Sequence, residues 1–311
     1  MQRIEQYDLI VIGAGPAGLS AALEAREAGV GKILVLDRLP APGGILTQCF
    51  HAGFGREGLR GVEYAARLAS LAHSADIEIR QDSAVTGLSA DGTATVFGDG
   101  AVYKIRGGAV ILASGARERT LWSGSVSGTR PAGVFTAGSV QKMLNLHGYG
   151  VGQKVAVLGS GDVGMIVAHH LAESGAEVIG VFEQSSVPGG LARNKRLYLD
   201  THGIPLITGC TVTRLHGAAR LTGVTVCDVD ASGKVLHESG RLVECDTLVT
   251  SIGLIPEREL ISGLSSEGDA PPWLFICGNA GQIHSLVESV VSDGQRTGAA
   301  AAAYLSSVGK R

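Results

Sequence analysis

Short apolar runs and an alanine-rich stretch of helical spacing alternate at the start of the chain. Residues 9–12 are all apolar, a helical pattern follows and ends at Gly29, and a second apolar run covers residues 33–36. A buried strand, a helix that ends at glycine and a second buried strand are typical of a βαβ unit with parallel strands. The pattern therefore predicts an α/β fold.

The same pattern returns 146 residues later in the chain. Segment 7–46 aligns without gaps with segment 153–192, and the glycines of one segment fall on glycines of the other. The matched residues are Gly13 with Gly159, Gly15 with Gly161, Gly18 with Gly164, Gly29 with Gly175, and Pro42-Gly43-Gly44 with Pro188-Gly189-Gly190. This internal repeat indicates a duplicated unit. Two domains are also the usual expectation for a chain of 311 residues.

Each copy carries Gly-x-Gly-x-x-Gly between its first strand and its helix, and an acid 24 residues after the first glycine. The acids are Asp37 and Glu183. In this fingerprint the glycines allow a tight turn, a close approach of the backbone to a pyrophosphate, and packing of the helix on the strand. The helix N-terminus offers N–H groups to the phosphates, and the acid accepts hydrogen bonds from a ribose. Two copies in register favour two dinucleotide sites.

Both copies continue with a hairpin and a further apolar strand. Residues 93–97 and 102–105 form the first predicted hairpin, before the strand at 109–115. Residues 224–229 and the run from 235 onward form the second, before the strand at 247–253. Each half is therefore expected to be a Rossmann-type sheet with a small β-meander.

Composition narrows the function classes. The net charge is −3, and 18% of residues are charged without basic runs, which argues against nucleic acid. The apolar stretches are too short for a membrane span, and the N-terminus lacks signal-peptide features, so a cytoplasmic location is expected. The five cysteines are scattered without a Cys-x-x-Cys pair, which argues against a disulfide scaffold.

The chain resembles the thioredoxin-reductase-like branch of the flavoproteins with two dinucleotide-binding domains. The motifs that carry the resemblance are IGAGPAG at 12–18, PGG at 42–44, VILASGARER at 110–119, VLGSGDVG at 157–164, SIGLIPE at 251–257 and LFICGNAGQIHSLVESVVSDGQRTG at 274–298. The resemblance implies that an NAD-binding domain, residues 119–246, is inserted into a FAD-binding domain, residues 1–118 plus 247–311.

The resemblance also implies which residues hold each cofactor. The expected FAD-binding residues are Gly13, Gly15, Pro16, Ala17, Gly18, Asp37, Arg38, Gly44, Gln48, Val85, Ser114, Gly115, Gly278 and Asn279. The expected residues of the nicotinamide dinucleotide site are Gly159, Gly161, Asp162, Val163, Gly164, Glu183 and Gly253.

Asn279 departs from the family, which has aspartate after the late glycine. An amide can still bond a ribityl hydroxyl, so FAD binding is expected with a changed local charge. The following helical pattern at 285–293 would direct its N-terminal amides at the flavin.

The charge at Glu183 favours NAD(H) over NADP(H), because a carboxylate repels a 2′-phosphate. Residues 184–186 are Gln-Ser-Ser and supply no cation. Arg193, Lys195 and Arg196 follow about ten residues later, and they could bind NADPH if their loop folds back.

The redox Cys-x-x-Cys of thioredoxin reductases is missing. Residues 133–140 read Gly-Val-Phe-Thr-Ala-Gly-Ser-Val, so thioredoxin reduction is excluded. RPAGVFTAGSVQKMLN at 130–145 and PGGILTQCFHAGFG at 42–55 resemble the FAD/NAD-binding subunits of multi-subunit dehydrogenases, including opine and cyanide-forming systems and proteins associated with glycerol-3-phosphate dehydrogenases. This likeness implies hydride exchange between NADH and FAD, with a partner subunit or redox acceptor protein and a homodimer as further expectations.

Two side chains are candidates for chemistry near the flavin. Cys49, in a cluster with Gln48 and His51, would be a thiolate or a nucleophile if its pKa were lowered, or else a buried apolar thiol. His284 would steady or protonate the flavin, or else cap a helix. A self-sufficient NADH oxidase, peroxidase or disulfide reductase using Cys49 is therefore an alternative. A non-catalytic flavin-bearing protein of an assembly is another, and Asn279 favours it.

His169 and His170, with Glu173 nearby, superficially suggest a metal site. Adjacent residues on a helix point about 100° apart. We therefore predict that these histidines lie on a solvated surface and hold no metal.

Overall fold

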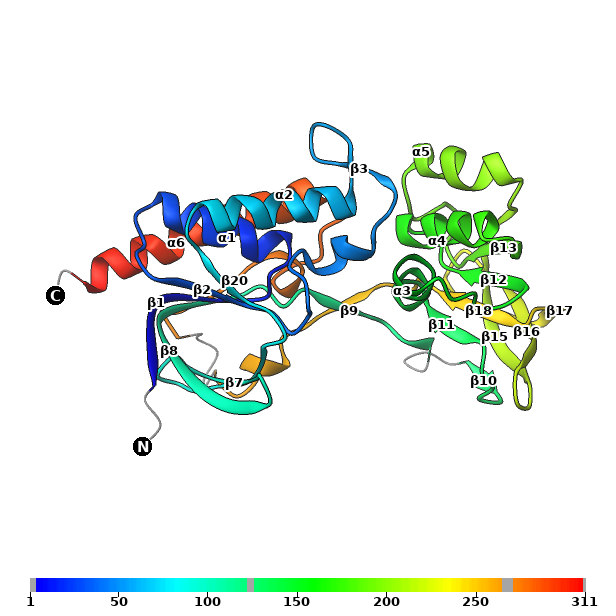
Figure 1. The fold of residues 1–311 in the computed structure, drawn as a ribbon. Coiled ribbons are helices and arrows are strands. Elements are labelled where there is room, and N and C mark those ends of the chain that lie inside the picture. The colour runs from blue at the N-terminus through cyan, green and yellow to red at the C-terminus, as the bar shows by residue number, and fades with distance from the viewer. Residues whose placement is uncertain (1–3, 122–125, 265–270, 310–311) are drawn as a thin grey trace. The chain divides into compact units, whose positions relative to one another are not determined.

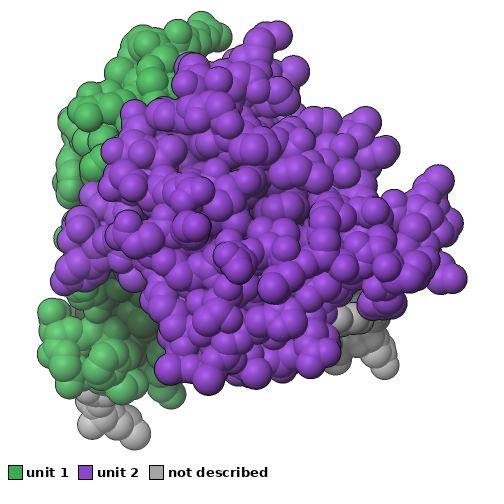
Figure 2. All heavy atoms as spheres, turned by 90° about the vertical axis from the view of Figure 1, so that its right-hand side faces the viewer, with its two compact units in different colours: residues 1–117, 255–311 green, residues 118–254 purple. Residues whose placement is uncertain are grey.

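The computed structural model describes residues 4–121, 126–264 and 271–309. The chain divides into two compact units, which Figure 2 colours separately. Unit 1 contains residues 1–117 and 255–311, and unit 2 contains residues 118–254. The second unit is therefore an insertion in the sequence of the first.

The boundary at the end of the insertion differs from the predicted one. The predicted boundary places residues 247–254 in the first domain, but they belong to unit 2. The reason is strand β18 (Thr247–Thr250), which pairs with β12 (Lys154–Leu158) and β11 (Val134–Thr136) in the sheet of unit 2. The closing strand of the second copy thus stays with that copy.

Unit 1 contains a seven-stranded mixed sheet in the order β5-β2-β1-β8-β7-β6, with β20 also paired to β8 (Figure 1). Strands β5, β2, β1, β8 and β20 pair in parallel, and β6, β7 and β8 form an antiparallel meander. The bounds are β1 (Glu5–Ile12), β2 (Ile33–Leu36), β5 (Glu78–Arg80), β6 (Ala84–Leu88), β7 (Thr93–Gly98), β8 (Ala101–Leu112) and β20 (Leu274–Ile276).

Helices α1, α2 and α6 lie on one face of this sheet, and the meander lies on the other (Figure 1). Alternate residues of β1 serve the two faces: Leu9 and Val11 pack under the helices, and Ile10 and Ile12 pack toward the meander. The bounds are α1 (Pro16–Glu27), α2 (Gly61–Ser74) and α6 (Val287–Val308). Shorter elements are η1 (Gly44–Gln48), β3 (Ala52–Phe54), β4 (Leu59–Arg60), η5 (Glu259–Ile261) and η6 (Gly278–Ala280).

Glycines let α6 approach α1 closely. A Cβ at Gly294 would overlap the backbone of Ala17, and one at Gly298 would overlap the backbone of Ala21. The long C-terminal helix therefore fastens the helix that follows the first fingerprint.

Unit 2 repeats this plan with a five-stranded parallel sheet in the order β11-β18-β12-β13-β14. A second sheet, β10-β15-β16-β17, contains the antiparallel meander. The strands not yet bounded are β10 (Ser127–Gly128), β13 (Glu177–Glu183), β14 (Leu206–Thr208), β15 (Cys210–Gly217), β16 (Leu221–Val229) and β17 (Val235–Val243). The helices are α3 (Ala137–His147), α4 (Asp162–Glu173), α5 (Ala192–Asn194), η3 (Lys195–Leu199) and η4 (Asp200–His202).

Two short strands carry the chain between the units. They are β9 (Ala116–Glu118) and β19 (Leu254–Pro256), and they pair with each other. The predicted fold class, two Rossmann-type units each with a β-meander, is confirmed. Within residues 4–121, 126–264 and 271–309, no helix combines the length and the apolar character that crossing a membrane requires.

Candidate functional site: two dinucleotide cradles

The glycines of the first fingerprint have three distinct surroundings. Gly13 has φ +110°, and a Cβ there would overlap the backbone of Ala113 at the end of β8. A Cβ at Gly18 would overlap the carbonyl of Gly13. Gly15, in contrast, has no atom within 4 Å of a built Cβ. Two glycines are therefore required by packing, and the third leaves open space where the fingerprint expects a pyrophosphate.

Helix α1 begins at Pro16, and Gly15 is its N-cap without a side-chain capping bond. No acid lies in the first turn. Proline is suited to this position because the first amide of a helix has no intrahelical partner. Ala17 is buried directly behind it, against Gly278 and Gly294. The N-terminus of α1 therefore keeps its positive end available to an anion.

Asp37 lies at the end of β2 and is 7% exposed. Its Oδ2 accepts a hydrogen bond from the Ala14 amide at 2.6 Å, and its Oδ1 accepts one from the Leu39 amide at 2.8 Å. These bonds hold the carboxylate beside the glycine loop and leave further lone pairs for ligand hydroxyls. The neighbouring Arg38 is exposed.

The second cradle repeats these bonds at the same offset of 146 residues. Glu183 Oε2 accepts the Ser160 amide at 2.8 Å, and Glu183 Oε1 accepts the Ser185 amide at 2.9 Å. The Ser160 hydroxyl adds a bond to Oε2 at 2.7 Å and accepts the Gly189 amide at 2.8 Å. The duplication thus extends from the sequence to the hydrogen bonds that orient each acid.

The glycines of the second fingerprint also behave like those of the first. Gly159 has φ +102°, and a Cβ there would overlap the carbonyl of Ser251. A Cβ at Gly164 would overlap the carbonyl of Gly159, whereas Gly161 has no atom within 4 Å of a built Cβ. Val163, on the first turn of α4, is exposed. Gly253, which follows β18, has φ +108°.

Asp162 distinguishes the second cradle from the first, because it puts an acid where α1 has Pro16. Its Oδ1 accepts the Leu191 amide and the Asn194 side-chain amide, both at 2.8 Å. The carboxylate therefore fastens the loop that carries Arg193.

Other expected FAD residues lie around the first cradle. Gly44 has φ +56°, and a Cβ there would stand 3.0 Å from Gly15 Cα, so its backbone lies against the fingerprint loop. Gln48 is buried at the end of η1. Val85 follows Ser83, whose amide donates to the Asp37 carbonyl at 2.8 Å. This bond brings the Val85 segment to the adenosine side of the cradle.

The motif around Ser114 is joined to the later part of unit 1. The Ser114 hydroxyl donates to the Glu257 carbonyl at 2.6 Å, and the Glu257 amide donates to the Gly115 carbonyl at 3.0 Å. Gly115 has φ +78°, a region in which glycine is favoured.

Asn279 and Gly278 form part of a small network before α6. The Asn279 Oδ1 accepts the His284 amide at 2.9 Å, and the Gly278 amide donates to Asp293 Oδ2 at 2.7 Å. Asp293 also pairs with Arg296 at 3.0 Å. Asp293 is not among the site residues expected from the sequence, although it lies within the late glycine motif. Its negative charge in that motif was the available signal.

His284 faces this network. Its Nε2 lies 3.6 Å from Asp293 Oδ2 and is buried without a hydrogen bond in the described part of the chain. The helix expected at 285–293 begins at Val287 and continues to Val308. His284 therefore lies in the turn before α6 and is not its N-cap, which is Leu286.

Cys49 does not have the environment of a reactive thiolate. It is 8% exposed, and its Sγ donates to the Ile45 carbonyl at 3.3 Å. Burial raises its pKa to about 12. The condition under which Cys49 was expected to be reactive, a lowered pKa, is thus contradicted, and the buried apolar thiol describes it.

The prediction about His169 and His170 is wrong in its geometry. Ligand atoms of these two residues and of Glu173 all lie within 4.8 Å of one another, and both histidines are partly buried. Side chains long enough to lean along the helix can converge although their Cβ atoms diverge.

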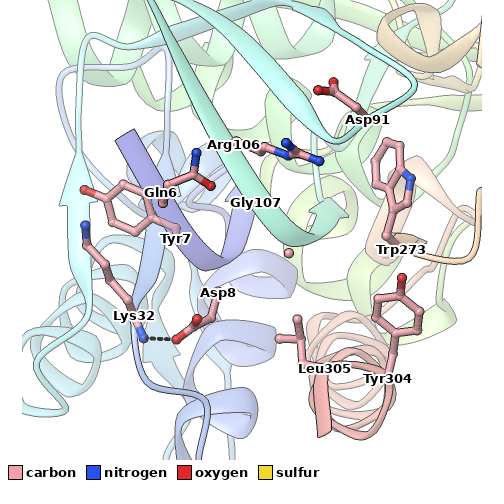
Figure 3. A pocket seen from close by; sticks show the side chains of 11 residues that line it. Gln6, Tyr7, Asp8, Lys32, Asp91, Arg106, Gly107, Trp273, Tyr304 and Leu305 are labelled. Atoms are coloured by element: carbon pink, nitrogen blue, oxygen red, sulfur yellow. Dashed lines mark hydrogen bonds between the residues drawn. The ribbon is translucent and has the colours of Figure 1, made fainter. Parts of the chain in front are cut away.

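A pocket of about 420 Å³ lies elsewhere in unit 1 (Figure 3). It is lined by Lys32, Arg106, Trp273 and Tyr304, among others. Its β1 residues, Gln6 to Asp8, stand near the amino end of that strand, whereas the fingerprint follows the carboxyl end. Because open α/β sheets bind dinucleotides at the carboxyl ends of their strands, this pocket is separate from the cradle.

Comparisons with known proteins agree with this geometry. The family described as pyridine nucleotide-disulphide oxidoreductase matches residues 7–270. The alpha chain of sarcosine oxidase from Corynebacterium sp. (strain U-96) is 30% identical over 82% of this chain and 27% of its own length. The HcnB chain of hydrogen cyanide synthase from Pseudomonas aeruginosa is 30% identical over 83% and 59%. An opine oxidase subunit of Agrobacterium tumefaciens is 31% identical over 58% and 38%. The chain thus spans about a quarter to three fifths of these relatives.

Solved structures support the fold. Thioredoxin reductase of T. acidophilum has a TM-score of 0.74 at 22% identity and covers 99% of this chain and 100% of its own. L-proline dehydrogenase of P. horikoshii has a TM-score of 0.67 at 18% identity, over 96% and 56%. The expected likeness to thioredoxin reductases in fold, and to subunits of opine and cyanide-forming enzymes in sequence, is confirmed.

Proposed function

The chain belongs to the pyridine nucleotide-disulphide oxidoreductase family and is an oxidoreductase. From this premise we propose that it binds FAD in unit 1 and NAD(H) in unit 2, and exchanges hydride between them within a larger dehydrogenase. The observation that carries the proposal is the duplicated cradle, in which Asp37 and Glu183 accept equivalent backbone bonds beside open glycine loops.

The residues present fit these cofactors. The open space at Gly15 and Gly161 admits the backbone approach that a pyrophosphate needs. Amides of the first turns of α1 and α4 would hold the phosphates, and Asp37 and Glu183 would accept ribose hydroxyls. When bound, the flavin would take a hydride from NADH or return one to NAD⁺.

The protein's own contribution is orientation, because hydride transfer between two rings depends on positioning more than on acid–base groups. Gly278 and Asn279 would approach the ribityl side of the flavin. The His284 Nε2, buried without a hydrogen bond in the described structure, is a donor or acceptor available to the cofactor. Asp293 and Asn279 fix the backbone on which His284 stands.

NAD(H) is proposed over NADP(H) because of Glu183. Ser160 and Ser185 hold its carboxylate with three hydrogen bonds. A phosphate on the adenosine ribose would meet this negative charge. Lys195 pairs with Asp200 at 2.5 Å and is already neutralised, whereas Arg193 and Arg196 lie outside this pair.

Anaerobic rapid mixing with NADH tests the exchange. The flavin absorbance of the purified protein should bleach, and Glu183→Ala should require more NADH for the same rate. Absence of bleaching with stoichiometric FAD bound would reject the proposal and favour the non-catalytic flavin-bearing role. Rapid peroxide or disulfide turnover that Cys49→Ser abolishes would favour the stand-alone enzyme instead.

A partner protein is part of the proposal, because the sequence relatives are named as subunits and are longer than this chain. The partner would oxidise the organic substrate or accept the electrons. Native purification should recover a complex, whereas the isolated chain should reduce an artificial acceptor with NADH and oxidise no amine or amino-acid substrate. Sedimentation of the isolated chain would check the expected homodimer.

A further inference from the structure

A cluster of imidazole and carboxylate groups lies at the C-terminal end of α4. His169, His170 and Glu173 come from the last turns of this helix, and His202 comes from η4. The His169 side chain is 19% exposed and the Glu173 side chain 56%, so the cluster opens to solvent on one side. The rings of Tyr198 and His202 pack against His169, with centroids 5.1 Å and 4.8 Å away.

The helix places Glu173 next to both histidines. Glu173 is four residues after His169 and three after His170, and both spacings bring side chains together on a helix. His169 Nε2 lies 3.4 Å from Glu173 Oε2. Two ligands at about 2.0–2.1 Å from a tetrahedral cation are about 3.3 Å apart. The ligand atoms of all three residues lie within 4.8 Å of one another, a spread that rotation of the exposed Glu173 can close.

His202 supplies the outer partner that metal-binding histidines usually have. Its Nε2 lies 2.8 Å from His169 Nδ1, at hydrogen-bond distance. If His169 donates this N–H, its Nε2 presents a lone pair to the Glu173 carboxylate. Two acceptors facing each other in this way favour a cation between them. The C-terminal end of a helix, where carbonyls lack partners, also favours positive charge.

We propose that His169 Nε2, a ring nitrogen of His170 and the Glu173 carboxylate bind a divalent transition-metal ion of the Zn²⁺ class. The fourth position is open to water, and His202 orients His169 from outside. Two imidazoles and a carboxylate suit Zn²⁺ better than Mg²⁺ or Ca²⁺, which take oxygen ligands. This site is independent of the proposed dinucleotide chemistry.

The position of the site indicates a structural role. His169 follows the start of α4 by seven residues, roughly 10 Å along the helix axis. The ion would link the end of α4, through His202, to the segment formed by η3 and η4. Metal binding should therefore stabilise unit 2 without being needed for the bleaching of the flavin by NADH.

Calorimetric titration of untagged, chelator-treated full-length protein with ZnCl₂ at pH 7.5 tests the site. We expect one equivalent to bind, and His169→Gln, His170→Gln and Glu173→Gln each to weaken binding at least tenfold. His202→Gln should weaken it about tenfold, as outer partners do. His73→Gln, an exposed histidine at the end of α2, is the matched control and should bind like the parent. Parent-like affinity in the three ligand variants, or no saturable binding, would overturn the proposal.

Electron paramagnetic resonance with one equivalent of Cu²⁺ identifies the ligands directly. The parent should show coupling to two imidazole nitrogens, and His170→Gln to one. Equal spectra for these two proteins would overturn the assignment. Circular dichroism of each metal-free variant shows whether it is folded. A variant that is not is replaced by the corresponding alanine, and parent-like metal affinity in that alanine variant would again refute the assigned ligand.

Discussion

Replacing Gly15 by valine should separate flavin binding from folding. A Cβ at Gly15 has no protein atom within 4 Å, and the backbone there is extended, with φ −74° and ψ −179°. Valine adopts this conformation without strain. Gly13 and Gly18 offer no such test, because side chains there would overlap protein backbone.

The cost to the protein itself is small. Gly15 is the N-cap of α1, and valine is a poorer N-cap than glycine by about 1 kcal/mol. For a domain of this size a loss of about 1 kcal/mol lowers the Tm by roughly 2–4 °C.

The cost to FAD binding is much larger. The side chain would fill the space through which phosphate oxygens reach the amides of α1. Losing two hydrogen bonds to a charged group, at about 1.5–3 kcal/mol each, removes about 3–6 kcal/mol of binding free energy. The Kd for FAD should therefore rise by roughly two to four orders of magnitude.

The assay compares two variants at equivalent positions. Apoprotein is titrated with FAD by fluorescence quenching, NADH binding is measured separately, and the Tm of each apoprotein is followed by circular dichroism. Gly161→Val, with equally open surroundings in the second copy, should retain FAD and lose NADH affinity. Parent-like FAD affinity in Gly15→Val, or loss of FAD in Gly161→Val, would refute the assignment of the two cradles.

Three further predictions concern side chains. Glu183→Gln removes a negative charge and should raise the NADPH/NADH ratio of kcat/KM about tenfold, roughly 1.4 kcal/mol; steady-state kinetics with an unchanged ratio would count against the specificity argument. Cys49→Ser should leave the rate of flavin bleaching by NADH unchanged in rapid mixing, because burial keeps the thiol protonated; a slower rate would contradict a purely apolar role for this thiol. Burial raises the pKa of Cys49, Cys245 and Cys277 from 9.0 to about 12, so unfolded thiols release protons above pH 9 that folded thiols keep. Stability to urea should therefore fall from pH 9 toward pH 12, with a shallower slope in Cys49→Ser; a slope equal to the parent's would contradict this.

Much of the fold follows from short-range spacing in the sequence. The glycine turns, the helices after them and the two meanders depend on residues within a few positions of one another, and they appear where the spacing predicts them. The repeat also predicts that 109–115 and 247–253 are equivalent strands. That equivalence, followed strictly, would have placed β18 in the second unit.

The sequence by itself determined that the chain contains two similar strand–glycine loop–helix units, because each is encoded by local spacing and the copies match at the same offset. Only the tertiary structure decided what distant residues do to one another. Cys49 is buried by elements outside its own loop, Asp293 reaches Gly278 across a turn, and His202 approaches His169 from another segment. Burial, hydrogen bonding and convergence of side chains depend on long-range packing, which local spacing does not encode.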